Sequence, residues 1–440
     1  MSGIISRRFI YNQGMVGKSA KTAFFWDKSL LWGIIAFQTF RELDVSFDLV
    51  TASDIRESGL AGYDTIFVPG GWASDKIVAL GDEGQSRIRD FVAGGGSYLG
   101  ICGGAGLALS HKSGLGLAPV SRMPTRERVP SFSGRISLRH SEPGHPIWNN
   151  VADDTVFHAW WPGQFSLDEA GGVAVLARYG EPGEDSYVTD LPVLPSVDWD
   201  AMEKSYGINL DPARLTGEPA VIETRFGDGT VILSYLHFET PGDDEGHKVL
   251  LNIFSYLARG KHMTSSDTGR RARNAASLYD LKPDAGISSI VNDLDKAAED
   301  LIAFGRKNYL WSERNDWILQ WRRGVRGVEY STLHAMIRAI SDNAARIDGS
   351  DSGAVNRLER LRELALPFFS DAKELLRLER DAIASGPISP LKTDDPRIGA
   401  LRKRLFSESK RCGGLYEEIV ELADEILLPL LQEGLKQDLL

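Results

Sequence analysis

The segment Ser97-Tyr98-Leu99-Gly100-Ile101-Cys102-Gly103-Gly104-Ala105-Gly106-Leu107 carries the strongest structural and functional signal of this chain. A short apolar run ends at Gly-x-Cys-x-Gly and small apolar residues follow, which is the pattern of a strand that turns sharply into a helix. The glycines on both sides of Cys102 are needed because neighbouring backbone packs too closely for a Cβ atom. The free N–H groups of the helix start favour a thiolate at this position. We therefore predict that Cys102 is a nucleophile, with a buried structural cysteine as the alternative.

A second apolar segment, residues 230–236, is typical of a buried strand and runs into His237-Phe238-Glu239. Residues two apart in an extended segment point to the same side. Glu239 is therefore expected to accept the proton of one His237 ring nitrogen and to leave the other nitrogen for Cys102. This is the arrangement of a base and its orienting carboxylate in a nucleophilic triad. Taken alone, His-x-Glu is more typical of a surface pair.

A third apolar strand, residues 65–68, ends in the turn Pro69-Gly70-Gly71. The backbone N–H groups of Gly70 and Gly71, together with that of Gly103, are candidates to hold an oxyanion. The alternative is a tight turn without a catalytic role.

Aromatic side chains near these segments are candidates to line a substrate pocket. For the adjacent pair Trp160 and Trp161, the alternative is packing in the protein core. The histidines between residues 140 and 158 show no metal-ligand spacing, so neither a metal nor an organic cofactor is expected. The pocket candidates are Trp72, Trp160, Trp161 and Phe238.

In this order, the three segments resemble the class I glutamine amidotransferase-like superfamily. Val68–Gly71 is similar to its oxyanion strand, Gly100–Gly104 to its elbow and His237–Glu239 to its terminal His-x-Glu. Within that superfamily, residues 81–104 resemble the biotin-protein ligase N-terminal-like domain. The resemblance covers about residues 20–260 and implies a flavodoxin-like, doubly wound parallel sheet with a β-rich insertion. It also implies cysteine-dependent chemistry on an amide or a related carbonyl substrate.

Two positions depart from the patterns of that superfamily. Ala105–Ala108 stands where glutamine-using members carry a Gln, which argues against glutamine hydrolysis. Gly103 stands where the chaperone and protease-like branch places a His, so the triad must come from His237 and Glu239. We expect a cysteine-dependent hydrolase or amidase-like protein. The alternatives are a non-catalytic ligand-binding or scaffolding module, and an ammonia-supplying glutaminase subunit of a synthetase.

Length and composition limit the remaining possibilities. A chain of 440 residues favours two domains, and its formal net charge of −11 argues against nucleic-acid binding. Cys102 and Cys412 lie far apart in sequence and are not expected to pair, which fits a reducing cytoplasm. No apolar run approaches the length of a membrane span. We expect a cytoplasmic protein that acts on a small-molecule or peptide-like amide, with neither nucleic acid nor membrane as a partner.

The hydrophobic periodicity changes along the chain. Alternating strand and helix patterns predict a first domain at residues 1–261, with a parallel sheet covered on both faces and a β-rich insertion between residues 115 and 215. A polar linker follows at residues 262–280. In residues 281–440, apolar residues recur with a period of about 3.6 positions, which predicts an all-α helical bundle. This bundle is a candidate surface for a homo-oligomer or a protein partner.

One segment of the predicted bundle combines tryptophans with arginines. Trp311, Trp317 and Trp321 are interleaved with arginines between residues 314 and 326. We expect an amphipathic helix whose apolar face packs in the bundle and whose basic edge is solvated. The alternative is a helix that contacts RNA.

Overall fold

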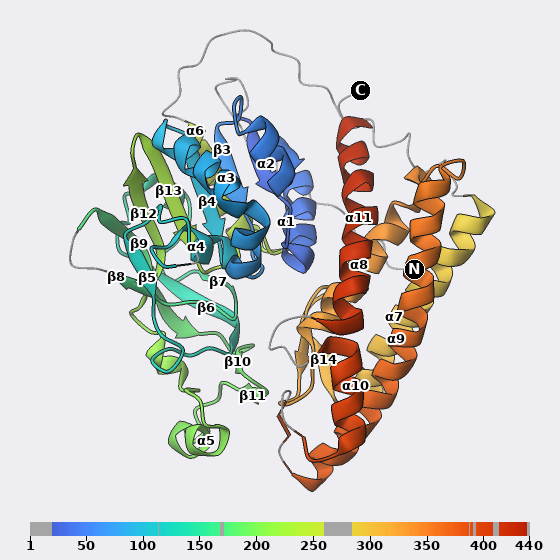
Figure 1. The fold of residues 1–440 in the computed structure, drawn as a ribbon. Helices are drawn as coiled ribbons and strands as arrows, with labels where there is room; N and C mark the ends of the chain where they lie inside the picture. The colour runs from blue at the N-terminus through green and yellow to red at the C-terminus, as the bar shows by residue number, and fades with distance from the viewer. Residues whose placement is uncertain are drawn as a thin grey trace.

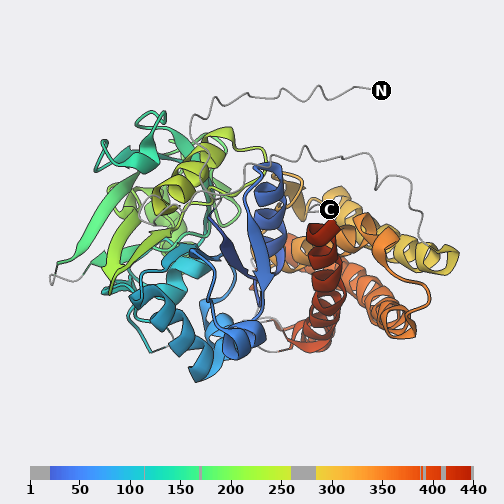
Figure 2. The ribbon, with the colours of Figure 1, turned by 90° about the horizontal axis from the view of Figure 1, so that it is seen from above.

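The computed structural model describes residues 20–112, 114–167, 171–258, 284–386, 388–389, 393–407 and 413–437. It has an α/β part up to Ala258 and a largely helical part from Ala285 onward, lying side by side (Figures 1 and 2). The predicted linker at residues 262–280 and Cys412 lie outside the described residues.

A set of parallel strands forms the centre of the α/β part. They pair in the order β2-β1-β3-β4-β13. Nearly every residue in them is buried, as expected for a parallel sheet covered on both faces. The strands are β1 (Thr22–Phe25), β2 (Phe47–Val50), β3 (Thr65–Val68), β4 (Ser97–Ile101) and β13 (Gly229–Ser234).

Helices cover both faces of this sheet, which confirms the doubly wound α/β prediction (Figure 1). On one face, α1 (Leu30–Glu42) and α6 (Asp244–Ala258) meet where the Phe40 and Phe254 rings lie 5.3 Å apart. On the other, α3 (Ala73–Ala93) packs against α4 (Gly103–Ala108) and α2 (Ala52–Ser58). The helix α3 contains a kink at Gly81, whose φ is 58°.

Antiparallel strands extend the sheet beyond β13, as the predicted β-rich insertion requires. They give an 11-stranded sheet within the described residues. A separate antiparallel pair is formed by β5 (Val120–Arg122) and β8 (Phe165–Leu167). A short helix, α5 (Trp199–Tyr206), follows the last strand of the insertion, β11, in the chain. The added strands are β12 (Pro219–Phe226), β9 (Val173–Pro182), β6 (Phe132–His140), β7 (Val156–Trp160), β10 (Tyr187–Val188) and β11 (Leu191–Pro192).

The C-terminal part is a bundle in which α9 packs against α7, α10 and α11, and α8 packs against α7 and α11. Residues 347–351 form a non-helical turn before α9. There, the Asp351 side chain accepts the N–H groups of Gly353 and Ala354 and starts α9. The helices are α7 (Ala285–Lys307), α8 (Val328–Asp342), α9 (Ser352–Ser385), α10 (Pro396–Phe406) and α11 (Gly414–Gln437).

The predicted helix through the tryptophan and arginine segment is wrong. The segment is a hairpin of β14 (Trp311–Glu313) and β15 (Leu319–Trp321), so the C-terminal part is not entirely helical. Its turn forms because the Asn315 carboxamide oxygen accepts the N–H groups of Trp317 and Ile318, at 2.9 and 2.8 Å. The arginines of this segment do not form the predicted solvated edge. Arg314 donates to the Asp185 carbonyl of the α/β part, and Arg323 donates to the Tyr206 carbonyl.

The two parts share an extensive interface. Helix α1 packs against α8, and α11 lies beside β2. Most residues of α1 are buried around its whole circumference, because one side faces the sheet and another faces α8. An apolar sequence on all sides of a helix is the signal of such double burial, and it was visible in residues 30–40. In the described parts of the chain, no helix is both long and apolar enough to cross a bilayer.

Candidate active site

The backbone at Cys102 has the strained geometry of a strand-to-helix elbow. Cys102 lies between β4 and α4 with φ 51° and ψ −104°, a region that side-chain-bearing residues rarely occupy. Its N–H donates to the Ser234 carbonyl at the end of β13, at 2.7 Å. The thiol is partly exposed and lies 4.0 Å from the carbonyl oxygen of Trp160. The elbow thus presents the sulfur at the carboxyl end of a central strand.

Close backbone packing explains the glycines around this elbow. A Cβ atom on Gly103 would overlap the Gly71 carbonyl, and one on Gly104 would overlap the Val68 carbonyl. The elbow therefore lies directly against the Pro-Gly-Gly turn that follows β3. Gly70 faces the ring of Trp32, while Gly71 has a φ of 108°. The structure thus brings Gly71 and Gly103 together, with Gly70 beside them.

His237 and Glu239 form a fully buried pair at the end of β13. The Nδ1–H of His237 donates to the Glu239 carboxylate at 2.7 Å, and neither side chain is exposed. Thr39 of α1 donates to the Glu239 carbonyl at 2.8 Å, and the His237 N–H donates to the carbonyl of His158. These bonds fix the orientation of the imidazole. Its Nε2 has no hydrogen-bond partner within the described residues.

The electrostatics of the pair favour a protonated imidazole. Burial by itself lowers the pKa of His237, but the charge of Glu239, together with the effect of Cys102, outweighs it and raises the pKa to about 10. The imidazolium is therefore stabilised beside the buried carboxylate. This arrangement can hold a sulfur nucleophile ready and can later supply a proton.

The aromatic candidates lie in different environments. Trp161 is partly buried beside the site, and Trp160 is buried with an indole N–H that has no partner in the described chain. Trp72 is 55% exposed immediately after the Gly70-Gly71 turn. Phe238 is fully buried and meets the Phe157 ring edge-on at 5.2 Å, so it belongs to the core.

Two further tryptophans belong to the site and were missed in the sequence. The Trp32 ring lies 4.5 Å from the His237 ring and 6.2 Å from that of Trp161. Trp321, in the hairpin of the C-terminal part, lies 5.1 Å from Trp161. No spacing in the sequence connects residue 321 to residue 161, because only the docking of the two parts brings them together.

A buried lysine lies behind the Gly70-Gly71 turn. The ammonium of Lys76 donates to the Asp27 carbonyl at 3.0 Å and to the Ser29 hydroxyl at 2.5 Å. Burial lowers its pKa to about 7, although Asp27 and Asp424 act in the opposite direction. Because Asp424 belongs to α11, the C-terminal part also supplies charge behind the turn.

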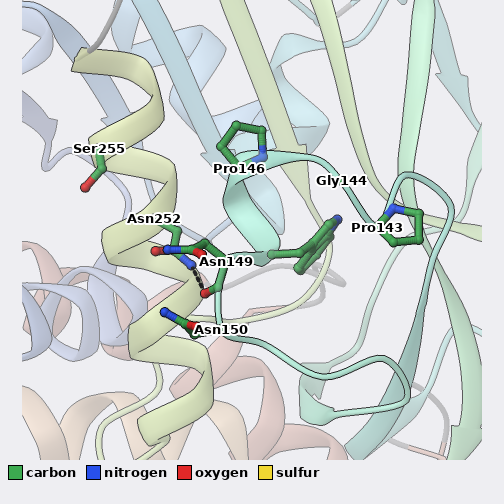
Figure 3. A pocket seen from close by; sticks show the side chains of 8 residues that line it. Pro143, Gly144, Pro146, Asn149, Asn150, Asn252 and Ser255 are labelled. Atoms are coloured by element: carbon green, nitrogen blue, oxygen red, sulfur yellow. Dashed lines mark hydrogen bonds between the residues drawn. The ribbon is translucent and has the colours of Figure 1, made fainter.

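The depression shown in Figure 3 lies apart from this constellation. It has a volume of about 440 Å³ between α6 and residues 143–150, and none of the predicted site residues lines it. The Asn252 amide at its wall is occupied by hydrogen bonds to the Ile147 and Asn149 carbonyls. A search of the described residues finds no group of His, Cys, Asp or Glu side chains suited to a metal ion.

One family model matches a part of the chain. Residues 52–112 match the model of the family "Biotin-protein ligase, N terminal". The matched segment runs from α2 to just beyond α4 and contains Cys102, which confirms the resemblance seen in the sequence over that range. A search of curated proteins finds no match to this chain.

Several solved structures are similar to somewhat more than half of this chain. PurLQS from Thermotoga maritima has a TM-score of 0.35 and 16% identity, covering 55% of this chain and 100% of that chain. A protein described as a GMP synthase subunit, from Thermoplasma acidophilum, has a TM-score of 0.36 and 14% sequence identity. The match covers 55% of this chain and 96% of that chain. A glutamine amidotransferase from Thermotoga maritima has a TM-score of 0.33 and 12% sequence identity. The match covers 55% of this chain and 84% of that chain.

Proposed function

We propose that this protein is a cysteine-dependent hydrolase that acts on an amide or a related acyl substrate through Cys102, His237 and Glu239. The observation that carries the proposal is the strained, partly exposed Cys102 after β4, with the buried His237–Glu239 pair after the neighbouring parallel strand β13. Backbone strain of this kind costs free energy and persists where the surrounding structure over-determines it, as at active sites.

In the proposed reaction, the Cys102 thiolate attacks the substrate carbonyl carbon, and a C–S bond forms as the C=O π electrons move to oxygen. The N–H groups of Gly71 and Gly103, with Gly70 beside them, would hold that oxyanion. When the oxyanion collapses, the bond to the leaving group breaks and His237 donates the proton that the leaving amine or alcohol needs. Water, deprotonated by His237, then hydrolyses the thioester and releases a carboxylic acid and the thiol.

Glu239 would orient His237 and stabilise its imidazolium form throughout these steps. The exposed Trp72 and the partly buried Trp161 are the proposed aromatic walls of the substrate site, with Trp32 behind the imidazole. No metal or organic cofactor takes part in any of these steps.

The test is a panel of amides, esters and thioesters incubated with wild type, Cys102→Ala and Cys102→Ser, with peptide mass spectrometry of the protein and product formation as the two readouts. We expect an acyl adduct on the Cys102-containing peptide of wild type and turnover that both variants lose. Turnover that persists in Cys102→Ala would contradict the proposal. Substrate binding without any adduct would instead favour a non-catalytic ligand-binding module.

A further inference from the structure

The loop between β1 and α1 connects the C-terminal helix α11 to the turn that follows β3. This loop, residues 26–29, lies at the carboxyl end of β1, and β1 pairs in parallel with β3. Lys28 in the loop has a φ of 55°, and Leu30 directly after it has a φ of 49°. Such conformations are unfavourable for residues with a side chain and persist only where surrounding contacts hold them. These contacts come from two directions, the Gly70-Gly71 turn and α11.

In the first direction, the loop lies directly against Gly71. A Cβ atom on Gly71 would overlap the Lys28 carbonyl, so a glycine is needed for this close approach. A Cβ atom on Gly103 would in turn overlap the Gly71 carbonyl. Backbone contacts therefore lead from Lys28 through Gly71 to the residue that follows Cys102. A shift of the loop would shift Gly71 and, with it, the N–H group proposed to hold the oxyanion.

Lys76, in the first turn of α3, fixes the loop relative to the same turn. Its side chain is fully buried, and its ammonium donates to the Asp27 carbonyl at 3.0 Å and to the Ser29 hydroxyl at 2.5 Å. These two partners stand on either side of Lys28 in the chain. The Lys76 Cε lies 3.3 Å from the place that a Cβ atom of Gly71 would occupy. Because a buried ammonium is costly unless its donors are used, these bonds hold the loop and the turn together.

In the second direction, α11 holds the loop with side chains of the C-terminal part. The indole N–H of Trp26, a fully buried side chain, donates to the Asp424 carboxylate at 2.8 Å. The Lys28 ammonium donates to the Glu421 carboxylate at 2.8 Å in a more exposed pair. Asp424 and Glu421 are three residues apart and therefore lie on the same face of the helix. One face of α11 thus reaches the loop at two points.

We propose that α11 positions the oxyanion site: through Trp26, the loop at residues 26–29 and Lys76, it holds Gly71 in the geometry that acyl transfer needs. The α/β part is then fully active only with the helical part docked. Asp424 and Lys76 are positioning residues, which act on the site through the backbone. The catalytic consequence rests on the proposed function, whereas the mechanical coupling of α11 to the turn does not.

The experiment compares two reactions of Cys102 in the full chain, acylation by p-nitrophenyl acetate and alkylation by iodoacetamide. Acylation forms a C–S bond through an oxyanion and releases p-nitrophenolate, whereas alkylation displaces iodide without any oxyanion. The quantity measured is the ratio of the two rate constants, from peptide mass spectrometry. It should fall about tenfold in Asp424→Leu and in Lys76→Met, because a misplacement of about 1 Å costs on the order of a hundredfold in rate and a smaller shift costs less. A fold that is merely looser would change both rates together.

Two further variants of α11 make the comparison specific. Asp424→Asn keeps an acceptor for the Trp26 indole and should recover most of the ratio. The control is Gln432→Met, which removes a different contact of α11 with the α/β part, the hydrogen bond to the Leu49 carbonyl at 3.4 Å. Its ratio should equal that of wild type. A ratio that stays at the wild-type value in both Asp424→Leu and Lys76→Met overturns the proposal.

Hydrogen exchange distinguishes this result from a failure of the proposed function. The N–H groups of Asp75 and Lys76 donate to the Trp72 carbonyl directly after the turn. Their exchange should become severalfold faster in Asp424→Leu but not in Gln432→Met, and unchanged exchange in Asp424→Leu overturns the coupling. Wild-type protein that resists acylation while this exchange still responds contradicts the proposed function and supports the coupling. If Lys76→Met fails to fold, as judged by circular dichroism, Asp424→Leu decides the question.

Discussion

The indole rings of Trp161 and Trp321 lie 5.1 Å apart with their planes inclined by 30°, and they join the two parts of the chain beside Cys102. Trp161 also meets Trp32, which in turn meets His237 at 4.5 Å. A continuous row of rings therefore runs from the β14–β15 hairpin to the buried imidazole. The C-terminal part contributes to the wall of the candidate site instead of standing apart from it.

Removing the indole of the hairpin should loosen this wall. We expect Trp321→Ala to increase the labelling of Cys102 by a bulky maleimide severalfold relative to labelling by iodoacetamide, because Trp161 loses the ring that packs against it. The control is Trp317→Ala in the same hairpin, a partly buried tryptophan that lies in the turn. Equal ratios in the two variants would show that the hairpin does not limit access to the thiol.

The pH profile of Cys102 alkylation tests the His237–Glu239 pair. His237→Ala should move the midpoint of the profile upward by about one pH unit or more, because no imidazolium then stabilises the thiolate. Glu239→Gln should act in the same direction but more weakly. Labelling at strongly alkaline pH should change little in either variant.

The control for this profile is His145→Gln, which disrupts another histidine–glutamate pair, with Glu223 at 3.1 Å. Its profile should coincide with that of wild type. Superimposable profiles in wild type, His237→Ala and Glu239→Gln would rule out the proposed triad. They would leave the helix start as the only influence on the sulfur.

Two glycines of α4 provide a matched test of the elbow packing. Gly104→Ala should lower the free energy of unfolding by at least about 2 kcal/mol, because the new methyl group would overlap the Val68 carbonyl. Gly106→Ala, on the same short helix, meets only Ala73 at an ordinary 3.7 Å and should stabilise by about 0.5–1 kcal/mol. Urea unfolding of both variants measures the difference. Similar effects of the two substitutions would mean that the elbow is not closely packed.

The partly buried Asp424 of α11 should make the stability of the interface depend on pH. Burial raises its pKa from 3.8 to about 6, although the Trp26 indole N–H at 2.8 Å and the charges of Lys28 and Lys76 favour the carboxylate. Between pH 3.8 and about 6, the native state therefore binds more protons than the unfolded state. The free energy of unfolding falls as the pH rises through this range, and it stays lower above about pH 6, where Asp424 is ionised in both states. Asp424→Asn should therefore raise the free energy of unfolding by about 1–3 kcal/mol at pH 7.5. The gain should shrink as the pH falls from about 6 to 4.

The control for Asp424 is Glu421→Gln on the same helix. Glu421 is 53% exposed and pairs with Lys28 at 2.8 Å, so its removal should change the stability little at any pH. Thermal unfolding between pH 4 and 8 distinguishes the two variants. A stability difference for Asp424→Asn that is flat across this range would contradict the assigned cost of burying the carboxylate.

Much of the α/β part was predictable because its signals are local. The apolar runs that became β3, β4 and β13 each end next to residues that the site uses, and parallel strands bring their carboxyl ends to one edge of a sheet. The 3.6-residue stripes predicted α7, α9 and α11 because helical periodicity is likewise a local signal. The β14–β15 hairpin was not predicted, because its turn depends on one Asn315 side chain while its tryptophans mimic a helical pattern.

The sequence by itself determined the elbow at Cys102, the His237–Glu239 pairing and the glycines around the elbow, because each depends on neighbours a few residues apart. Only the tertiary structure decided that Trp321 meets Trp161 and that Asp424 bonds to Trp26. These contacts join residues more than one hundred positions apart. No local pattern encodes them, because they form only when separate elements pack their apolar faces together and bury whatever polar groups lie between.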